Sequence, residues 1–221
     1  MPGMPLEIDV FWSFRSPYSY LATPRLVELE RRYELAIRVR PVLPLAVRIE
    51  GFFERVNPLW PPYLLRDCVR IAESLGMPFN WPRPDPIVQE FPSRKVAADQ
   101  PYIYRLTRLG ALAAERGFGL PFIAEVSRVI FGGTVGWNEG SHLADAAKRA
   151  GGDLDEMDRA LAAPAEARRL DAVIAANQAA LEQAGHWGVP TMVFQGEPFF
   201  GQDRIDLLVW RLRKHGLRER V

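Results

Sequence analysis

The sequence has very little cysteine and no long apolar run. A single cysteine, Cys68, is present among 221 residues, which excludes an intrachain disulfide and a multi-cysteine metal site. No segment approaches the ~18 uninterrupted apolar residues that a membrane-spanning helix needs. The first residues lack the basic region and apolar stretch of a secretory signal. We therefore expect a cytoplasmic protein that binds neither a metal nor a membrane.

An excess of charge of one sign is also missing. Lysine and arginine number 28, aspartate and glutamate 27, and the formal net charge is +1. Nucleic-acid binding depends on a one-sided basic field, so we expect no nucleic-acid partner. The 48% hydrophobic and 25% charged residues are typical of a globular protein with a sizeable core.

The chain begins with a strand–helix–strand pattern. Residues 8–14 form a β-branched and aromatic run, which predicts a buried strand. Ser16 and Pro17 follow, a good N-cap and a good first helical residue, and the predicted helix runs to about Tyr33. Alternating apolar and polar residues over 35–43 predict a second strand. The opening is a β-α-β unit, whose crossover is expected to be right-handed.

Between residue 44 and about residue 185 the strand signal disappears, and it returns near the end of the chain. Predicted helices in this block span residues 63–75, 99–116 with Asp99 as its cap, 121–131, 141–150, 154–161 and 164–184. The proline-rich residues 80–94 predict an irregular connection. Two short strands, at 191–194 and 198–200, precede a closing helix over 203–215.

These elements predict an α/β fold with a large all-helical insertion domain. An insertion of this length is acceptable where its two ends lie close together. We expect residues 1–44 and 186–221 to form one discontinuous domain around the sheet, and residues 45–185 to form the helical insertion domain.

Two motifs carry a resemblance to a known family. Residues 16–19, Ser-Pro-Tyr-Ser, stand between the first strand and its helix, and residues 188–191 read Gly-Val-Pro-Thr, followed by Gly-Glu-Pro-Phe-Phe-Gly-Gln-Asp-Arg at 196–204. Both resemble the active-site segments of the glutathione-using branch of the DsbA-like thioredoxin superfamily, with 2-hydroxychromene-2-carboxylate isomerases and kappa-class glutathione transferases. The resemblance covers nearly the whole chain and implies a thioredoxin-like fold.

The resemblance gives Ser16 a catalytic role. The oxidoreductase relatives carry Cys-x-x-Cys where this chain has Ser16 and Ser19, so it cannot cycle a disulfide there. The Ser16 hydroxyl can instead donate to a glutathione thiolate, and a hydrogen bond to a charged group is worth about 1.5–3 kcal/mol. The thiolate is the reactive nucleophile. The alternative is that Ser16 serves only as a helix N-cap.

The cofactor-binding residues are likewise implied by the resemblance. Pro190 should be cis, and the backbone of Val189 should pair with the cysteinyl part of glutathione. Gln202 and Asp203 should bind its γ-glutamyl end; alternatively, Asp203 is an N-cap and Gln202 a surface residue. Asn57 should contact glutathione or substrate, or is an ordinary loop residue.

Near Asn57 the sequence departs from the family. The lysine that the family places near the glycyl carboxylate is missing, and Trp60-Pro61-Pro62 occupies that stretch. Arg48, Arg55 and Arg66 are the candidates to replace it.

Several aromatic residues and one histidine suit a substrate pocket. The aromatic set is Phe52, Phe53, Trp60, Trp81 and Trp187, which fits a flat apolar ligand or an ordinary core. His186 could act as an acid or base or be structural. Cys68, on the apolar stripe of a predicted helix, is expected to be inert core.

The predicted function is a glutathione-dependent isomerase of the 2-hydroxychromene-2-carboxylate isomerase type, acting on an aromatic or conjugated carbonyl compound. A kappa-like glutathione transferase and a non-catalytic protein that binds another small ligand are the alternatives. The resemblance also implies a homodimer.

Overall fold

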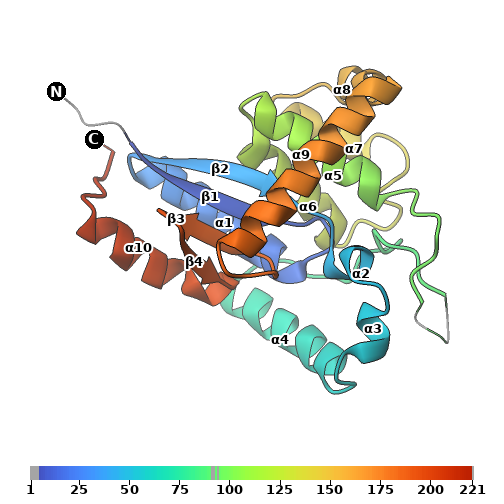
Figure 1. The fold of residues 1–221 in the computed structure, drawn as a ribbon, viewed down its shortest axis with the longest axis horizontal. Helices are drawn as coiled ribbons and strands as arrows, with labels where there is room; N and C mark the ends of the chain where they lie inside the picture. Colours follow the sequence, from blue (N-terminus) through green and yellow to red (C-terminus); the bar gives the residue numbers. More distant parts are fainter. Residues whose placement is uncertain (1–4, 91–92, 94, 221) are drawn as a thin grey trace.

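A computed structural model describes residues 5–90, 93 and 95–220 of the chain (Figure 1). The strands of these residues form one four-stranded sheet in the order β2-β1-β3-β4. Their bounds are β1 (Leu6–Trp12), β2 (Leu35–Pro41), β3 (Thr191–Phe194) and β4 (Glu197–Phe200). β1 pairs parallel with β2 and antiparallel with β3, and β3 pairs antiparallel with β4. The predicted α/β fold is confirmed, and its sheet is small and mixed.

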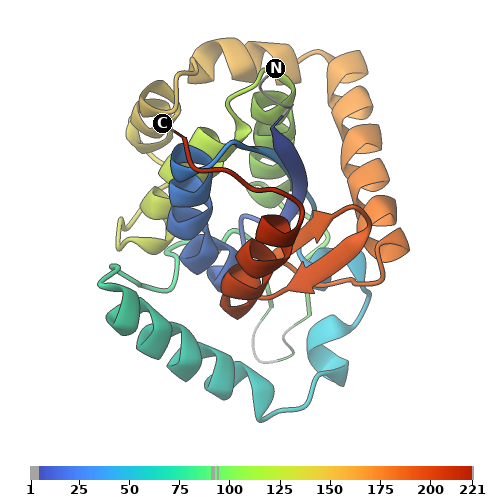
Figure 2. The ribbon, with the colours of Figure 1, turned by 90° about the vertical axis from the view of Figure 1, so that its left-hand side faces the viewer.

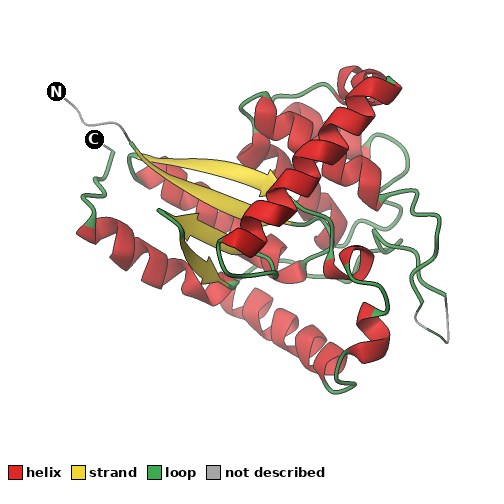
Figure 3. Ribbon diagram, in the orientation of Figure 1, coloured by secondary structure: helices red, strands yellow, loops and turns green. Residues whose placement is uncertain are grey.

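The helices follow the predicted order. They are α1 (Pro17–Arg32), α2 (Leu45–Arg48), α3 (Phe52–Arg55), α4 (Trp60–Leu75), α5 (Ile103–Glu115), α6 (Gly119–Phe131), α7 (His142–Arg149), α8 (Leu154–Leu161), α9 (Pro164–Gln183), the 3-10 helix η1 (Gln202–Arg204) and α10 (Ile205–Lys214) (Figure 3). The short helices α2 and α3 were not predicted. The prediction that Asp99 caps a helix is wrong, because α5 begins at Ile103 with Tyr102 as N-cap residue.

The two faces of the sheet are covered by different helices. Successive side chains of a strand point to opposite faces, and in β1 this sends Val10 and Trp12 into the large core with α1 and α10. Phe11 faces the other way and packs with Val193 and with Leu181 of α9. Figures 1 and 2 show α9 along one face of the sheet and α1 with α10 along the other.

The insertion helices share the large core with the sheet. The ring of Phe14, just after β1, makes edge contacts with Trp12 at 4.7 Å and with Phe122 of α6 at 6.3 Å between centroids. These ring contacts of Phe14 hold the turn that follows β1 between the sheet and α6. The division of the chain at residues 44 and 185 stays a prediction. No helix of the described residues is long and apolar enough to cross a membrane.

Candidate active site

Ser16 is the N-cap residue of α1 and comes four residues after the end of β1. Its backbone is extended (φ −97°, ψ 110°), and its Oγ accepts the N–H of Ser19 at 3.2 Å, so the N-cap role is confirmed. The same hydroxyl donates to the carbonyl oxygen of Val189 at 3.2 Å. Ser16 therefore lies between the N-terminus of α1 and a loop 173 residues further along the chain.

That loop carries the predicted cis proline. The Val189–Pro190 bond is cis, as the resemblance implied. The Val189 carbonyl accepts the Ser16 hydroxyl, while the Val189 N–H has no hydrogen-bond partner among the described residues. An open N–H beside an extended chain can receive the backbone of a peptide-like ligand.

Gln202 and Asp203 are brought to the same end of the sheet. The N–H of Gly201 donates to the Pro190 carbonyl at 2.9 Å, which ties the start of η1 to the cis-proline loop. Arg25 of α1 donates to the Gln202 carbonyl at 3.1 Å. Asp203 is exposed and pairs with Arg204 at 2.8 Å. It lies inside η1 and does not cap α10, so its reading as an N-cap is wrong.

Asn57 lies apart from these residues in the hydrogen-bond network. It is exposed, and its Oδ1 accepts the N–H of Leu59 at 3.0 Å in a local turn before α4. This bond fits the alternative that Asn57 is an ordinary loop residue. A contact between Asn57 and glutathione stays a prediction.

Among the three arginines considered as replacements for the family lysine, Arg48 is tied to the loop. It donates to the carbonyl oxygens of Trp187 at 2.7 Å and Leu43 at 2.8 Å. Burial lowers the pKa of Arg48, opposed by the charge of Glu182. Arg55 donates to the carbonyl oxygens of Glu50 and Gly51 within its own turn.

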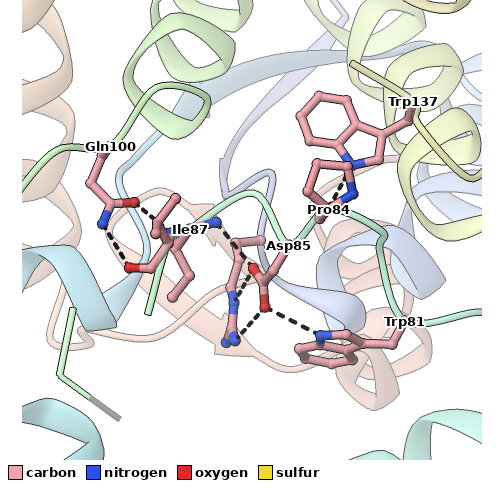
Figure 4. A network of polar contacts seen from close by, with 8 residues as sticks. Trp81, Pro84, Asp85, Ile87, Gln100 and Trp137 are labelled. Carbon is pink, nitrogen blue, oxygen red and sulfur yellow. Dashed lines mark hydrogen bonds and ion pairs between the residues drawn. The ribbon is translucent and has the colours of Figure 1, made fainter. Parts of the chain in front are cut away.

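An ion pair next to Ser16 was not foreseen. Arg15 makes a two-point contact with Asp85, at 3.1 Å from Nε and 3.0 Å from Nη2. Its guanidinium also lies over the rings of Phe53 and Trp81, at 5.2 and 5.0 Å from their centroids. Asp85 accepts two further bonds, from Trp81 Nε1 at 3.2 Å and from the N–H of Ile87 at 3.0 Å (Figure 4).

This network fastens the proline-rich connection to the active-site turn. Figure 4 also shows Trp137 donating to the Pro84 carbonyl, at 2.6 Å. With Arg15 and Asp85 70 positions apart, no local periodicity links them. A charged residue inside an otherwise uncharged turn was the one available signal.

Two other ionisable side chains near the turn stay neutral. The Tyr18 hydroxyl donates to Asp67 at 2.9 Å, and burial, followed by that bond, raises the pKa of Tyr18. Burial raises the pKa of the Cys68 thiol to about 12. Cys68 is fully buried in the large core, which confirms its predicted place there, and a buried thiol of raised pKa is expected to be unreactive.

A cavity of about 620 Å³ lies beside the site. Residues from α2, α3 and the segment before α5 line it, including Arg48, Phe52 and Phe53. Two contacts connect it to the turn: Phe53 packs on Arg15, and Arg48 binds the loop that carries Val189. Of the five predicted pocket aromatics, Phe52 and Phe53 line this cavity.

The described residues contain no group of three or more histidine, cysteine, aspartate or glutamate side chains placed to hold a metal ion. The arrangement offers instead a hydroxyl donor at the positive end of α1, an open backbone N–H at Val189 and a neighbouring cavity. These groups suit an extended ligand that brings an anionic atom to Ser16.

Comparison with known proteins gives relatives of similar length and fold. The 2-hydroxychromene-2-carboxylate isomerase of Pseudomonas putida is 26% identical over 205 residues, 91% of either chain. A solved 2-hydroxychromene-2-carboxylate isomerase superimposes with a TM-score of 0.71 at 23% identity over 95% of both chains. The cytosolic disulfide reductase DsbM of Pseudomonas aeruginosa with GSH reaches 0.57 at 18%, over 94% of this chain and all of the other. A DSBA-like thioredoxin domain matches residues 7–213, and the chain therefore belongs to the DSBA-like thioredoxin domain family.

Proposed function

We propose that this protein is a glutathione-dependent isomerase of the 2-hydroxychromene-2-carboxylate isomerase type, acting on an aromatic or conjugated carbonyl compound. The observation that carries the proposal is the Ser16 hydroxyl, held at the N-terminus of α1 against the cis Val189–Pro190 loop. A serine in this place can activate a thiol but cannot exchange a disulfide. The names of the relatives support isomerase chemistry.

The residues present fit glutathione. The open N–H of Val189 would pair with the backbone of its cysteinyl residue, next to Pro190. Gln202 and Asp203, at the end of the sheet that holds Pro190, would bind the γ-glutamyl group. At the glycyl end the candidates are Arg48, across the loop, and Asn57. A related fold, DsbM, has been solved with GSH, which supports the same ligand here.

Ser16 would hold the sulfur as an anion. Rotation about its Cβ–Oγ bond redirects the hydroxyl hydrogen from the Val189 carbonyl to a sulfur atom, while Oγ continues to accept the N–H of Ser19. A donor to a charged acceptor is worth about 1.5–3 kcal/mol, or roughly 1–2 pKa units. The start of α1 adds about 0.3–1 kcal/mol. A thiol of ordinary pKa about 8.5 would then be substantially ionised near pH 7.

When bound, glutathione would supply a thiolate nucleophile for reversible addition to the conjugated carbonyl compound, with Ser16 holding the sulfur and the Val189 N–H pairing with its backbone. The cavity walled by Phe52 and Phe53 would hold the flat substrate beside the sulfur and limit the access of water. The ion pair of Arg15 and Asp85 would hold the cavity wall and the active-site turn in fixed positions relative to each other.

The test is the interconversion of 2-hydroxychromene-2-carboxylate and its ring-opened isomer, followed by ultraviolet absorbance. We expect catalysis with glutathione and none with S-methylglutathione, which has no thiol. Free thiol should be constant through the reaction; a falling thiol count would identify a glutathione transferase. Equal rates with and without glutathione would contradict the proposal. The family resemblance further favours a homodimer, and sedimentation analysis would test this assembly.

A further inference from the structure

His186 lies in the loop that joins α9 to β3, stacked between two aromatic rings. Its imidazole is nearly parallel to Trp187, 4.6 Å away and inclined by 9°, and to Phe200, 3.9 Å away and inclined by 22°. Its Nδ1 accepts the backbone N–H of Gly188 at 2.9 Å. A ring nitrogen that accepts carries no proton, so this geometry requires the neutral tautomer with the proton on Nε2.

The bond to His186 fixes the backbone directly before Val189. Thr191 Oγ1 donates to the Gly188 carbonyl at 2.7 Å, so both peptide groups of Gly188 are tied to side chains. The loop has no room for a side chain at this position: a Cβ on Gly188 would lie 2.6 Å from the Phe200 ring and 3.1 Å from His186 Cε1. Thr191 thus holds the peptide plane that carries the open Val189 N–H, and His186 holds the peptide plane directly before it.

We propose that neutral His186 is a positioning residue that holds the Gly188–Val189 backbone in its ligand-binding orientation, and that protonation of Nδ1 releases it. A proton on Nδ1 would bring two N–H donors face to face and remove the acceptor that Gly188 needs. The expected effect on ligand binding rests on the proposed function; the effect on the loop does not.

Two charged side chains lie near the loop. Arg48 of α2 donates to the carbonyl of Trp187, next in the chain. Glu182, near the end of α9, interacts with Arg48. β4 contributes the uncharged ring of Phe200 to the stack. Burial lowers the pKa of His186, which agrees with the neutral tautomer that the bond from Gly188 requires.

The experiment follows the Gly188 amide and the His186 ring by NMR as the pH is lowered from 8 to 5, and measures the affinity for S-methylglutathione at each pH. S-methylglutathione is chosen because it has no thiol whose ionisation would mask the effect. We expect the amide and the ring to titrate together. Because only the neutral fraction binds, the affinity should fall about tenfold for each pH unit below the pKa of His186.

Two variants separate the acceptor from the ring. His186→Asn offers an uncharged acceptor to Gly188, and its affinity should be independent of pH over this range. His186→Phe keeps the stacking but loses the acceptor, and it should bind several-fold more weakly at every pH. A Gly188 amide that does not follow the His186 titration, or His186→Phe binding like the wild type, would overturn the inference. If the Gly188 amide and the His186 ring titrate together but S-methylglutathione does not bind, the role of His186 in holding the loop would stand and the glutathione site would be rejected.

Discussion

Replacement of Ser16 by alanine should remove most of the acidity of a bound thiol. The Ser16 hydroxyl is the hydrogen-bond donor that the site directs toward the cis-proline loop. Loss of one bond to a charged acceptor costs about 1.5–3 kcal/mol, and the thiol pKa of bound glutathione should rise by roughly 1–2 units. The α1 N-terminus remains, so a smaller depression of about 0.3–1 kcal/mol should survive.

Ser16 is also a helix cap, and the two roles must be separated. Ser16→Ala removes the acceptor of the Ser19 N–H and should cost about 1 kcal/mol of the free energy of unfolding, whereas Ser16→Gly should cost only a few tenths of that unit. Both variants lack the hydroxyl, so both should raise the thiol pKa equally. Ser19→Ala is the matched control, because the Ser19 Oγ is buried without a partner among the described residues.

The assay is the ultraviolet absorbance of the thiolate, titrated with pH at saturating protein, together with urea unfolding of each variant. The reasoning is refuted if Ser16→Ala and Ser16→Gly leave the thiol pKa at the wild-type value, or if Ser19→Ala raises it by the same amount. A pKa that follows the loss of stability rather than the hydroxyl would assign Ser16 to capping alone.

Three further predictions concern packing and ionisation. Asp85→Asn should weaken the pair with Arg15, whose side chains are 24% and 14% exposed, and lower the urea unfolding free energy by about 1–3 kcal/mol. Cys68, with its pKa raised to about 12 by burial, should be protonated at pH 8 and not react with a thiol-specific disulfide reagent until the chain is unfolded. Gly110→Ala places a Cβ 2.7 Å from the Phe14 ring and should cost about 1–3 kcal/mol in thermal unfolding.

Each of these has its own check. Arg31→Gln is the control for Asp85→Asn: it breaks the exposed pair with Glu28 and should leave the unfolding midpoint unchanged. An equal loss of stability in Asp85→Asn and Arg31→Gln would argue against a special role for Asp85. Rapid reaction of Cys68 in the native protein would show that its helix opens readily. Wild-type stability of Gly110→Ala would mean that the Phe14 ring can move aside.

The sequence predicted the sheet and the turn after β1 because their signals are local. A β-branched and aromatic run gives a strand by itself, and Ser16 followed by Pro17 gives a helix start. The cis state of Pro190 came from the family resemblance, since the ordinary frequency of a cis X-Pro bond is only about 5–6%.

The features that sequence reasoning missed depend on contacts between distant residues. α2 and α3 are four residues long, too short to show helical periodicity. Asp99 has the chemistry of a cap, yet α5 starts four residues later. The contacts of Arg15 with Asp85, and of His186 with Phe200 across the sheet end, follow only from the folded chain.

The most direct measurement of the central claim is isothermal titration of glutathione into the wild-type protein, with the ultraviolet absorbance of the thiolate recorded in parallel. The account predicts saturable binding in the millimolar range or tighter, and a thiol pKa below that of free glutathione. No binding at millimolar glutathione, or binding with an unshifted thiol pKa, would contradict it.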